Sequence, residues 1–188
     1  MLTVCIGNIC RSPLAERLLR LRLAEHVAAG HLLVDSAGVG AVVGHGVDAL
    51  ADEQLTRLGG SGEGFAARQI SRQVVEQSDL ILTATTDVRA RALREDPRAL
   101  KRMFTLGEFA SVCANAEDLS ITSPSALVAY AATHRPVGTG AELDVLDPIG
   151  ADEATHRAVA DQIDGYVTAI AARLGPRLAA PGSLDSPA

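Results

Sequence analysis

Short apolar runs alternate along this chain with longer segments in which apolar residues recur every three or four positions. The short runs predict buried strands, and the longer segments predict helices that cover a sheet. The strands are expected at residues 2–5, 32–35, 79–84 and 102–106. The helices are expected at residues 13–27, 47–58, 72–77, 86–94 and 152–174, with a shorter helical segment at 125–134.

This alternation predicts the α/β class, as a three-layer sandwich with a central four-stranded parallel sheet flanked by helices. Ligands of such sheets bind at the carboxyl ends of the strands, and the first of these ends is Cys5. The helix that follows is expected to begin with Ser12 as its N-cap and Pro13 in its first position. Thr86 is expected to cap a later helix.

One domain is expected to span residues 1–180, because 188 residues with 47% hydrophobic content suffice for one core. Within it, residues 117–140 break the alternation with turn-rich flanks and are interpreted as an insertion. Residues 181–188 are expected to form a solvated, disordered tail.

Composition argues against several classes of function. Seventeen Lys and Arg against 23 Asp and Glu give a net charge of −6, so neither nucleic acid nor a membrane is an expected partner. Three cysteines make no disulfide scaffold, which favours a reducing, cytoplasmic location. Aromatic residues make up 3% of the chain and Trp is missing, so the core is expected to be aliphatic, with Cys113 inside it. His156 is expected to face solvent.

Residues 5–13, Cys-Ile-Gly-Asn-Ile-Cys-Arg-Ser-Pro, connect the first predicted strand directly to a helix N-terminus. Backbone N–H groups converge at such a turn and the helix dipole adds positive potential, so the loop predicts an anion site. Gly7 and Asn8 tolerate the left-handed backbone that a tight loop needs. The planar fork of Arg11 suits two oxygens of a phosphate.

A thiol at the base of an anion site is a candidate nucleophile. The N–H groups, the helix dipole and Arg11 all favour the thiolate of Cys5, and Ser12 is placed to donate its hydroxyl to it. The alternative is that Cys5 is a buried residue at a strand end and that Arg11 and Ser12 merely begin a helix. A zinc site lacks a second Cys or His pair, and a Walker-type loop lacks its Gly-Lys-Ser/Thr, so neither metal nor cofactor is expected.

The segment Val-Cys-Ile-Gly-Asn-Ile-Cys-Arg-Ser-Pro-Leu-Ala-Glu at residues 4–16 resembles the signature of the low-molecular-weight protein-tyrosine phosphatases. That signature is Cys, five residues, Arg and Ser or Thr, with Gly-Asn inside it and Pro-x-Ala-Glu after it. Further segments that resemble the family lie at residues 35–38, 67–69, 79–83 and 144–150. The resemblance covers residues 1–174 and fits worst over 117–140.

The resemblance implies an arsenate-reductase-like fold and metal-free hydrolysis of phosphotyrosine in proteins through a cysteinyl-phosphate intermediate. Cys5 would attack phosphorus, with Ser12 stabilising its thiolate. Asp147 would protonate the leaving phenolate and then deprotonate the attacking water. Phosphate or another oxyanion would be held by the Arg11 side chain and by loop N–H groups. These N–H groups belong to Ile6, Gly7, Asn8, Ile9, Cys10 and Arg11.

Three further assignments follow from the resemblance. Asn8 and Ser36 resemble a pair that supports the loop by hydrogen bonding. Cys10 resembles a second cysteine that traps an oxidised nucleophile as a disulfide, and its alternative is a small buried residue. Asp147 is favoured as the acid because Asp-Pro-x-Gly matches the family there. Asp144 is its rival, and a carboxylate before proline often only starts a turn.

Two positions depart from the family pattern. Ile149 stands where a Tyr is common, so the mouth of the pocket is expected to be aliphatic. Phe65 stands where a histidine usually precedes Ala-Arg-Gln, which predicts that Asn8 has one partner fewer.

Three alternatives of function stay open. A protein-arginine phosphatase of the same fold usually carries Thr where this chain has Ile9, so Ile9 favours phosphotyrosine. A thioredoxin-linked arsenate reductase needs two further cysteines after the third strand, and residues 83–88 contain none. A non-catalytic phosphate-binding module needs neither the nucleophile Cys5 nor the acid Asp147.

Overall fold

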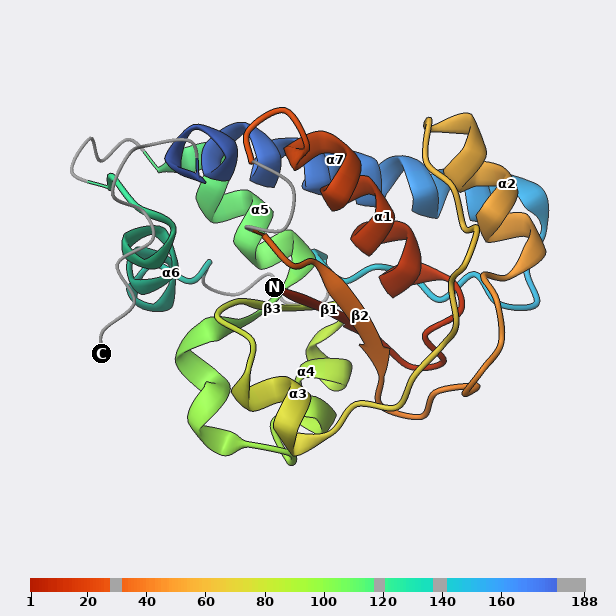
Figure 1. Ribbon diagram of the computed structural model, residues 1–188, viewed down its shortest axis with the longest axis horizontal. Coiled ribbons are helices and arrows are strands. Elements are labelled where there is room, and N and C mark those ends of the chain that lie inside the picture. Colours follow the sequence, from red (N-terminus) through yellow and green to blue (C-terminus); the bar gives the residue numbers. More distant parts are fainter. Residues whose placement is uncertain (28–31, 117–120, 137–141, 179–188) are drawn as a thin grey trace.

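A four-stranded parallel sheet forms the centre of the molecule (Figure 1). The computed structural model describes residues 1–27, 32–116, 121–136 and 142–178. The strand order is β2-β1-β3-β4, and every neighbouring pair is parallel. The strands are β1 (Leu2–Cys5), β2 (Asp35–Gly38), β3 (Ile81–Thr83) and β4 (Met103–Thr105).

Helices cover both faces of the sheet, which confirms the predicted three-layer α/β sandwich (Figure 1). The helices of one layer are α1 (Arg11–Leu23), α2 (Ala49–Arg57), α5 (Leu106–Asn115) and α7 (Glu153–Leu178). Those of the other are α3 (Arg72–Glu76), α4 (Thr86–Ala92) and the 3-10 helix η1 (Pro97–Arg102). A further helix, α6 (Pro124–Thr133), packs against η1 and α7.

The side chains of β1 alternate between two hydrophobic clusters, one on each face of the sheet. Leu2 and Val4 belong to the cluster under α3 and α4. Cys5 belongs to the cluster that contains Leu14 and Leu18 of α1. Because successive strand residues point to opposite faces, this alternation directs the Cys5 thiol toward the layer of α1 and α7.

Strand β2 begins three residues later than the apolar pattern predicts, so the expected strand at 32–35 is wrong. Pairing with β1 begins at Asp35, whereas Leu33 is 71% exposed and forms no strand. Small residues suit β2 because the loop after β1 passes close to it. A Cβ atom at Gly38 would lie 2.3 Å from the carbonyl oxygen of Ile6, so glycine permits this approach.

Two predicted helix caps are also wrong. Helix α1 begins at Arg11 without a side-chain capping bond, and the Ser12 hydroxyl lies 3.0 Å from Cys5 Sγ instead. Helix α4 is capped by Thr85, one residue before the predicted Thr86. In α4 two adjacent threonines can cap the helix, whereas in α1 the hydroxyl of the expected cap, Ser12, lies against Cys5 and the N-cap position is Cys10.

Helix α5 was not predicted, because it follows β4 without an intervening loop. Thr105 ends the strand and caps the helix. Its hydroxyl accepts from the Glu108 N–H at 3.1 Å, and the Glu108 carboxylate accepts from the Thr105 N–H at 2.9 Å. This capping box is visible in the sequence as Thr-x-x-Glu, which was the available signal.

Part of the segment interpreted as an insertion contributes to the core. Leu127 and Ala131 of α6 are fully buried in the cluster that also contains residues of α7. The helix confirms the helical segment expected at 125–134. Residues 117–120, 137–141 and the expected tail at 181–188 lie outside the described part of the chain.

Cys113 and His156 are both buried, although only Cys113 was expected to be. Cys113 lies in the core as expected. His156 does not face solvent: it is buried, with Nδ1 3.9 Å from Asp48 Oδ1, because the first turns of α7 pack against the start of α2.

Candidate active site

The loop between β1 and α1 folds back over the thiol of Cys5. Asn8 has a φ of 55°, the left-handed conformation that asparagine tolerates better than most residues. This turn directs the Asn8 backbone N–H toward Cys5 Sγ at 3.3 Å. The thiol therefore lies at the carboxyl end of β1, beneath the loop, where the sequence placed it.

Ser12 is hydrogen-bonded to the thiol from the first turn of α1. Its Oγ lies 3.0 Å from Cys5 Sγ and accepts a hydrogen bond from Asn8 Nδ2 at 2.9 Å. Because that lone pair is already used by Asn8, the Ser12 proton is directed away from Asn8. The sulfur is its nearest acceptor, since the next one, the Ala37 carbonyl oxygen, lies at 3.5 Å. A hydroxyl that donates to sulfur stabilises a thiolate.

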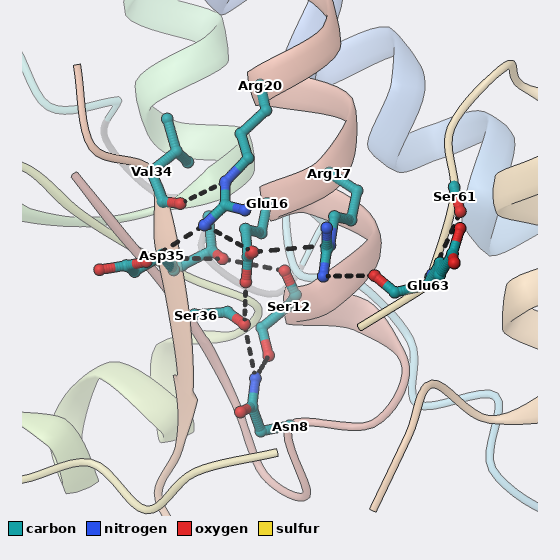
Figure 2. A network of polar contacts seen from close by, with 12 residues as sticks. Asn8, Ser12, Glu16, Arg17, Arg20, Val34, Asp35, Ser36, Ser61 and Glu63 are labelled. Carbon is teal, nitrogen blue, oxygen red and sulfur yellow. Dashed lines mark hydrogen bonds and ion pairs between the residues drawn. The ribbon is translucent and has the colours of Figure 1, made fainter. Parts of the chain in front are cut away.

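Asn8 Nδ2 donates to two serine hydroxyls (Figure 2), and the side-chain oxygen of Asn8 is engaged as well. Its second amide hydrogen goes to Ser36 Oγ at 2.8 Å, and its Oδ1 accepts from the backbone N–H of Arg68 at 2.8 Å. The expectation that Phe65 leaves Asn8 short of a partner is thus wrong. A backbone N–H three residues further along supplies the bond.

Arg11 is a buried guanidinium whose Nε has no partner in the described part of the protein. Nη1 donates to the Val145 carbonyl oxygen at 3.1 Å, and Nη2 donates to Asp147 Oδ2 at 2.5 Å. Nε is buried and has no hydrogen-bond partner among the described residues. A buried N–H without a partner is costly, so Nε is a donor suited to an anion in the loop.

Backbone donors of the loop add to this positive site. Within the described residues, the N–H groups of Ile6, Gly7, Ile9 and Cys10 donate to no protein acceptor. They lie where α1 begins, at the positive end of its dipole. Together with Arg11 they form a cradle for a tetrahedral oxyanion.

The two rival aspartates have different partners. Asp144 accepts from the Thr86 N–H at 2.9 Å and from the Thr86 hydroxyl at 3.0 Å, so both of its oxygens hold the start of α4. Asp147 is 41% exposed and pairs with Arg11. Asp147 is therefore the carboxylate that the fold brings to the anion cradle, and Asp144 has a structural role.

The other two cysteines are protonated, buried thiols. Burial, and to a smaller extent the neighbouring Cys5, raise the pKa of Cys10 to about 12. Burial likewise raises the pKa of Cys113 to about 12. All three cysteines are free. Cys5 and Cys10 are therefore not bonded to each other.

The mouth of the cradle is aliphatic. The loop after β2 is tied to the loop after β1, because the Gly40 N–H donates to the Ile6 carbonyl oxygen and the Val42 N–H donates to that of Gly7. Five exposed aliphatic side chains belong to these two loops and to the segment around Asp147. They are Ile6, Val42, Val43, Leu146 and Ile149.

Sequence reasoning missed three residues of the site. Arg68 and Glu16 both lie within segments that matched the family signature, but neither had a predicted role. Val145 contributes only its backbone carbonyl, for which a sequence carries no signal. Within the described residues no group of three or more His, Cys, Asp or Glu side chains is arranged to hold a metal ion. None of the described helices has the length and apolar character required to cross a membrane.

Comparison with known proteins relates this site to one family. The sequence profile of the family described as low molecular weight phosphotyrosine protein phosphatase matches residues 1–136. The low molecular weight protein-tyrosine-phosphatase Wzb of Escherichia coli (strain K12) is 41% identical over 113 residues, which cover 60% of this chain and 73% of Wzb.

Two solved structures share the fold across almost the whole chain. Wzb of Vibrio vulnificus in complex with benzylphosphonate has a TM-score of 0.70 at 23% identity, covering 92% of this chain and 97% of that one. YwlE arginine phosphatase from Geobacillus stearothermophilus has a TM-score of 0.67 at 24% identity, covering 91% and 89%. At such identities the structures show the shared fold alone. The profile and the sequence relative carry the assignment: the chain belongs to the low molecular weight phosphotyrosine protein phosphatase family.

Proposed function

We propose that this protein hydrolyses phosphotyrosine-type phosphomonoesters in protein substrates through a cysteinyl-phosphate intermediate. The observation that carries the proposal is the position of Arg11. It lies in the loop that covers the Cys5 thiol, and it pairs with Asp147 at 2.5 Å. A candidate nucleophile, an anion-binding group and a candidate acid are thus within one site.

The reaction begins with attack of the Cys5 thiolate on phosphorus, which breaks the bond to the leaving oxygen. The negative charge on the phosphoryl oxygens is balanced by Arg11 and by the loop N–H groups of residues 6–11. Asp147 donates its proton to the leaving oxygen and afterwards removes a proton from the water that attacks the cysteinyl phosphate. Ser12 donates to Cys5 Sγ when the sulfur leaves, and so stabilises the departing thiolate.

The exposed aliphatic side chains at the mouth support an aryl leaving group. Packing a phenyl ring against Ile6 or Leu146 removes apolar surface from water, which makes binding of an aryl group more favourable. A phosphorylated guanidinium instead needs polar or acidic partners, because burying its N–H groups unpaired is costly. Ile9 packs beside Gly7 in the same loop: its Cγ1 lies 3.4 Å from the position that a Cβ would take on Gly7.

Two other functions are less well supported. The structural neighbour YwlE is an arginine phosphatase, so phosphoarginine is the second candidate substrate. A phosphate-binding module without turnover has no use for Asp147 beside Arg11, and that pairing favours catalysis. Arsenate reduction needs additional thiols near Cys5, whereas the third cysteine, Cys113, lies in the core.

The substrate class is tested with three peptides that differ only in the phosphorylated residue: phosphotyrosine, phosphoarginine and phosphoserine. Release of phosphate is measured in the presence of a metal chelator. We expect phosphotyrosine to give the highest kcat/KM, because the apolar mouth contacts its ring. A higher kcat/KM for phosphoarginine would assign the protein to the second candidate function, and no release from any peptide would favour the binding module.

We also propose that the protein works in the cytoplasm. Its three free thiols support a reducing compartment, where cysteines stay unpaired. In the same proposal Cys10 is the partner that forms a disulfide with Cys5 after oxidation. The high pKa of Cys10 makes that step slow, because only its thiolate attacks an oxidised sulfur.

A further inference from the structure

Arg91 of α4 is a half-buried arginine that the proposed mechanism does not use. Helix α4 begins at the carboxyl edge of the sheet, three residues after β3 ends, and packs against β1 and β3 (Figure 1). Side chains on a helix tilt toward its N-terminus, so the side chain of Arg91 leads back toward this edge. Its Nη2 lies 3.5 Å from the carbonyl oxygen of Val39, in the loop after β2.

The part of that loop contacted by Arg91 runs beside the loop over Cys5. The Val39 N–H donates to the Cys5 carbonyl oxygen at 3.0 Å, and the Gly40 N–H donates to the Ile6 carbonyl oxygen at 3.0 Å. A Cβ atom on Gly40 would lie 3.6 Å from Arg91 Nη2 and 4.0 Å from Ile6 Cγ2. The guanidinium and the exposed side chain of Ile6 therefore flank the same glycine, which places Arg91 at the edge of the aliphatic mouth.

Arg91 differs from its neighbours in having no carboxylate partner. Within the described residues it forms no ion pair, although Asp87 lies four positions earlier on the same helix. Its one side-chain hydrogen bond there goes to Val39, so most of its N–H donors remain available to a ligand. Three other arginines of the site and of α4 are already paired: Arg11 with Asp147, Arg68 with Asp35 and Arg89 with Glu108.

A carboxylate on the substrate suits this free guanidinium. The planar fork of arginine matches the two oxygens of a carboxylate. Consecutive residues of an extended peptide advance about 3.3–3.6 Å, so an Asp or Glu one or two positions from a tyrosine bound at Ile6 comes within reach of Arg91. The chain as a whole has a net charge of −6, which disfavours acidic partners, so binding them requires a local cation of this kind.

We propose that Arg91 is a specificity-determining residue: it pairs with an Asp or Glu side chain beside the phosphotyrosine of a protein substrate. Acidic phosphotyrosine sequences are therefore the preferred substrates. The inference rests on the proposed function in one respect, that phosphotyrosine occupies the cradle, and it deepens that function by naming the class of sequence. Arg91 contacts the flank of the substrate and not the phosphoryl group, so its effect falls on KM rather than on kcat.

The test compares two phosphotyrosine peptides that differ only in carrying Glu or Gln at the positions on either side of the phosphotyrosine. We expect the unaltered protein to favour the Glu peptide about three- to fivefold in kcat/KM at low ionic strength, because a partly exposed ion pair contributes modestly. The preference should lie in KM and should disappear at about 1 M salt. In Arg91→Gln the ratio of the two kcat/KM values should fall to about one. A general loss of activity cancels in this ratio.

Lys101→Gln is the matched control, because it removes the same single positive charge. Lys101 is exposed and belongs to η1, in the same layer as α4. It lies just before β4 begins, at the edge of the parallel sheet opposite to the mouth. We expect this variant to keep the preference of the unaltered protein. An equal loss of preference in both variants would mean that total charge decides it, and would overturn the proposal.

An affinity measurement separates this inference from the proposed function. Calorimetric titration of the Cys5→Ser protein gives the Kd of each peptide without hydrolysis, and we expect the same preference for Glu there and its loss in Cys5→Ser/Arg91→Gln. The proposal is overturned if the two peptides bind Cys5→Ser equally, or if Arg91→Gln leaves the preference unchanged. Absence of phosphate release from both peptides by the unaltered protein refutes the proposed function, whereas the affinity ratio still decides the role of Arg91.

Discussion

The guanidinium of Arg11 and the carboxylate of Asp147 are joined by a 2.5 Å contact, although 136 positions separate them in the sequence. The pair links the loop after β1 to the segment that precedes α7. It places the proposed acid beside the group that is proposed to bind the phosphoryl oxygens. In the proposed mechanism, Asp147 therefore competes with phosphate for Arg11 and also protonates the leaving group.

Asp147→Asn should consequently have two effects of opposite sign. Turnover of an aryl phosphate with a basic leaving group should fall about a hundredfold, because no proton reaches the leaving oxygen. Inhibition by inorganic phosphate should become up to about fivefold tighter, since a competing, partly exposed charge is removed. Steady-state kinetics with phosphate as competitor measures both. Weaker phosphate inhibition in this variant would contradict the role of the pair.

Asp144→Asn provides the comparison for that substitution. Its oxygens hold the N–H and hydroxyl of Thr86 at the start of α4, so the variant should lose about 1 kcal/mol of unfolding free energy. The dependence of turnover on the basicity of the leaving group should stay unchanged. Urea unfolding and a series of substituted phenyl phosphates test these two points. A change in the leaving-group dependence would make Asp144 the acid instead.

Asn8→Ala and Asn8→Gly should both lower the free energy of unfolding, and alanine should lower it more than glycine. Both substitutions remove three hydrogen bonds and leave the partly buried Arg68 N–H unpaired, at a cost of about 2–3 kcal/mol. Alanine should cost about 1 kcal/mol more, because the φ of 55° is unfavourable for it and acceptable for glycine. Urea unfolding of the two variants measures the difference. Equal stabilities would mean that the loop relaxes to an ordinary backbone conformation.

Iodoacetate at neutral pH should modify Cys5 alone. With a pKa of about 12, Cys10 and Cys113 are thiolates in only about one molecule in 10⁵ at pH 7. Mass spectrometry of the digested protein should find one carboxymethyl group, on the peptide that contains Cys5, and none after Cys5→Ser. Substantial labelling of Cys10 would contradict its raised pKa.

The same two thiols should make the fold sensitive to alkaline pH. In the unfolded chain these thiols have the ordinary pKa of 9.0, whereas in the folded protein burial raises their pKa to about 12. Above about pH 9 the unfolded chain therefore binds fewer protons, so stability falls as pH rises. Urea unfolding from about pH 8 to about pH 10 measures this slope. Cys113→Ala should make it shallower, and an unchanged slope would assign the loss to other groups.

Local patterns predicted those features that depend on neighbouring residues. The loop at residues 5–13 shows its chemistry in the sequence, because thiol, turn residues, arginine and helix start are contiguous. The sheet class follows similarly from alternating strands and helices. By contrast, the apolar run at Leu33 misplaces β2, since exposure of that side chain is decided by the rest of the fold.

Features that depend on distant residues were not predictable in the same way. The family resemblance favours Asp147 over Asp144, but only the fold determines that Arg11 lies beside Asp147 and Thr86 beside Asp144. The third partner of Asn8 is a backbone N–H, of Arg68, and every residue except proline offers that group. The sequence pattern alone therefore wrongly indicated an incomplete network around Asn8.

The central claim is that Cys5 is the nucleophile of a metal-free hydrolysis. The most direct measurement is release of p-nitrophenol from p-nitrophenyl phosphate, in the presence of a chelator, by the unaltered protein, Cys5→Ser and Cys10→Ser. We expect turnover by the unaltered protein and by Cys10→Ser, and none above background by Cys5→Ser. Turnover retained by Cys5→Ser, or none by the unaltered protein, would contradict it.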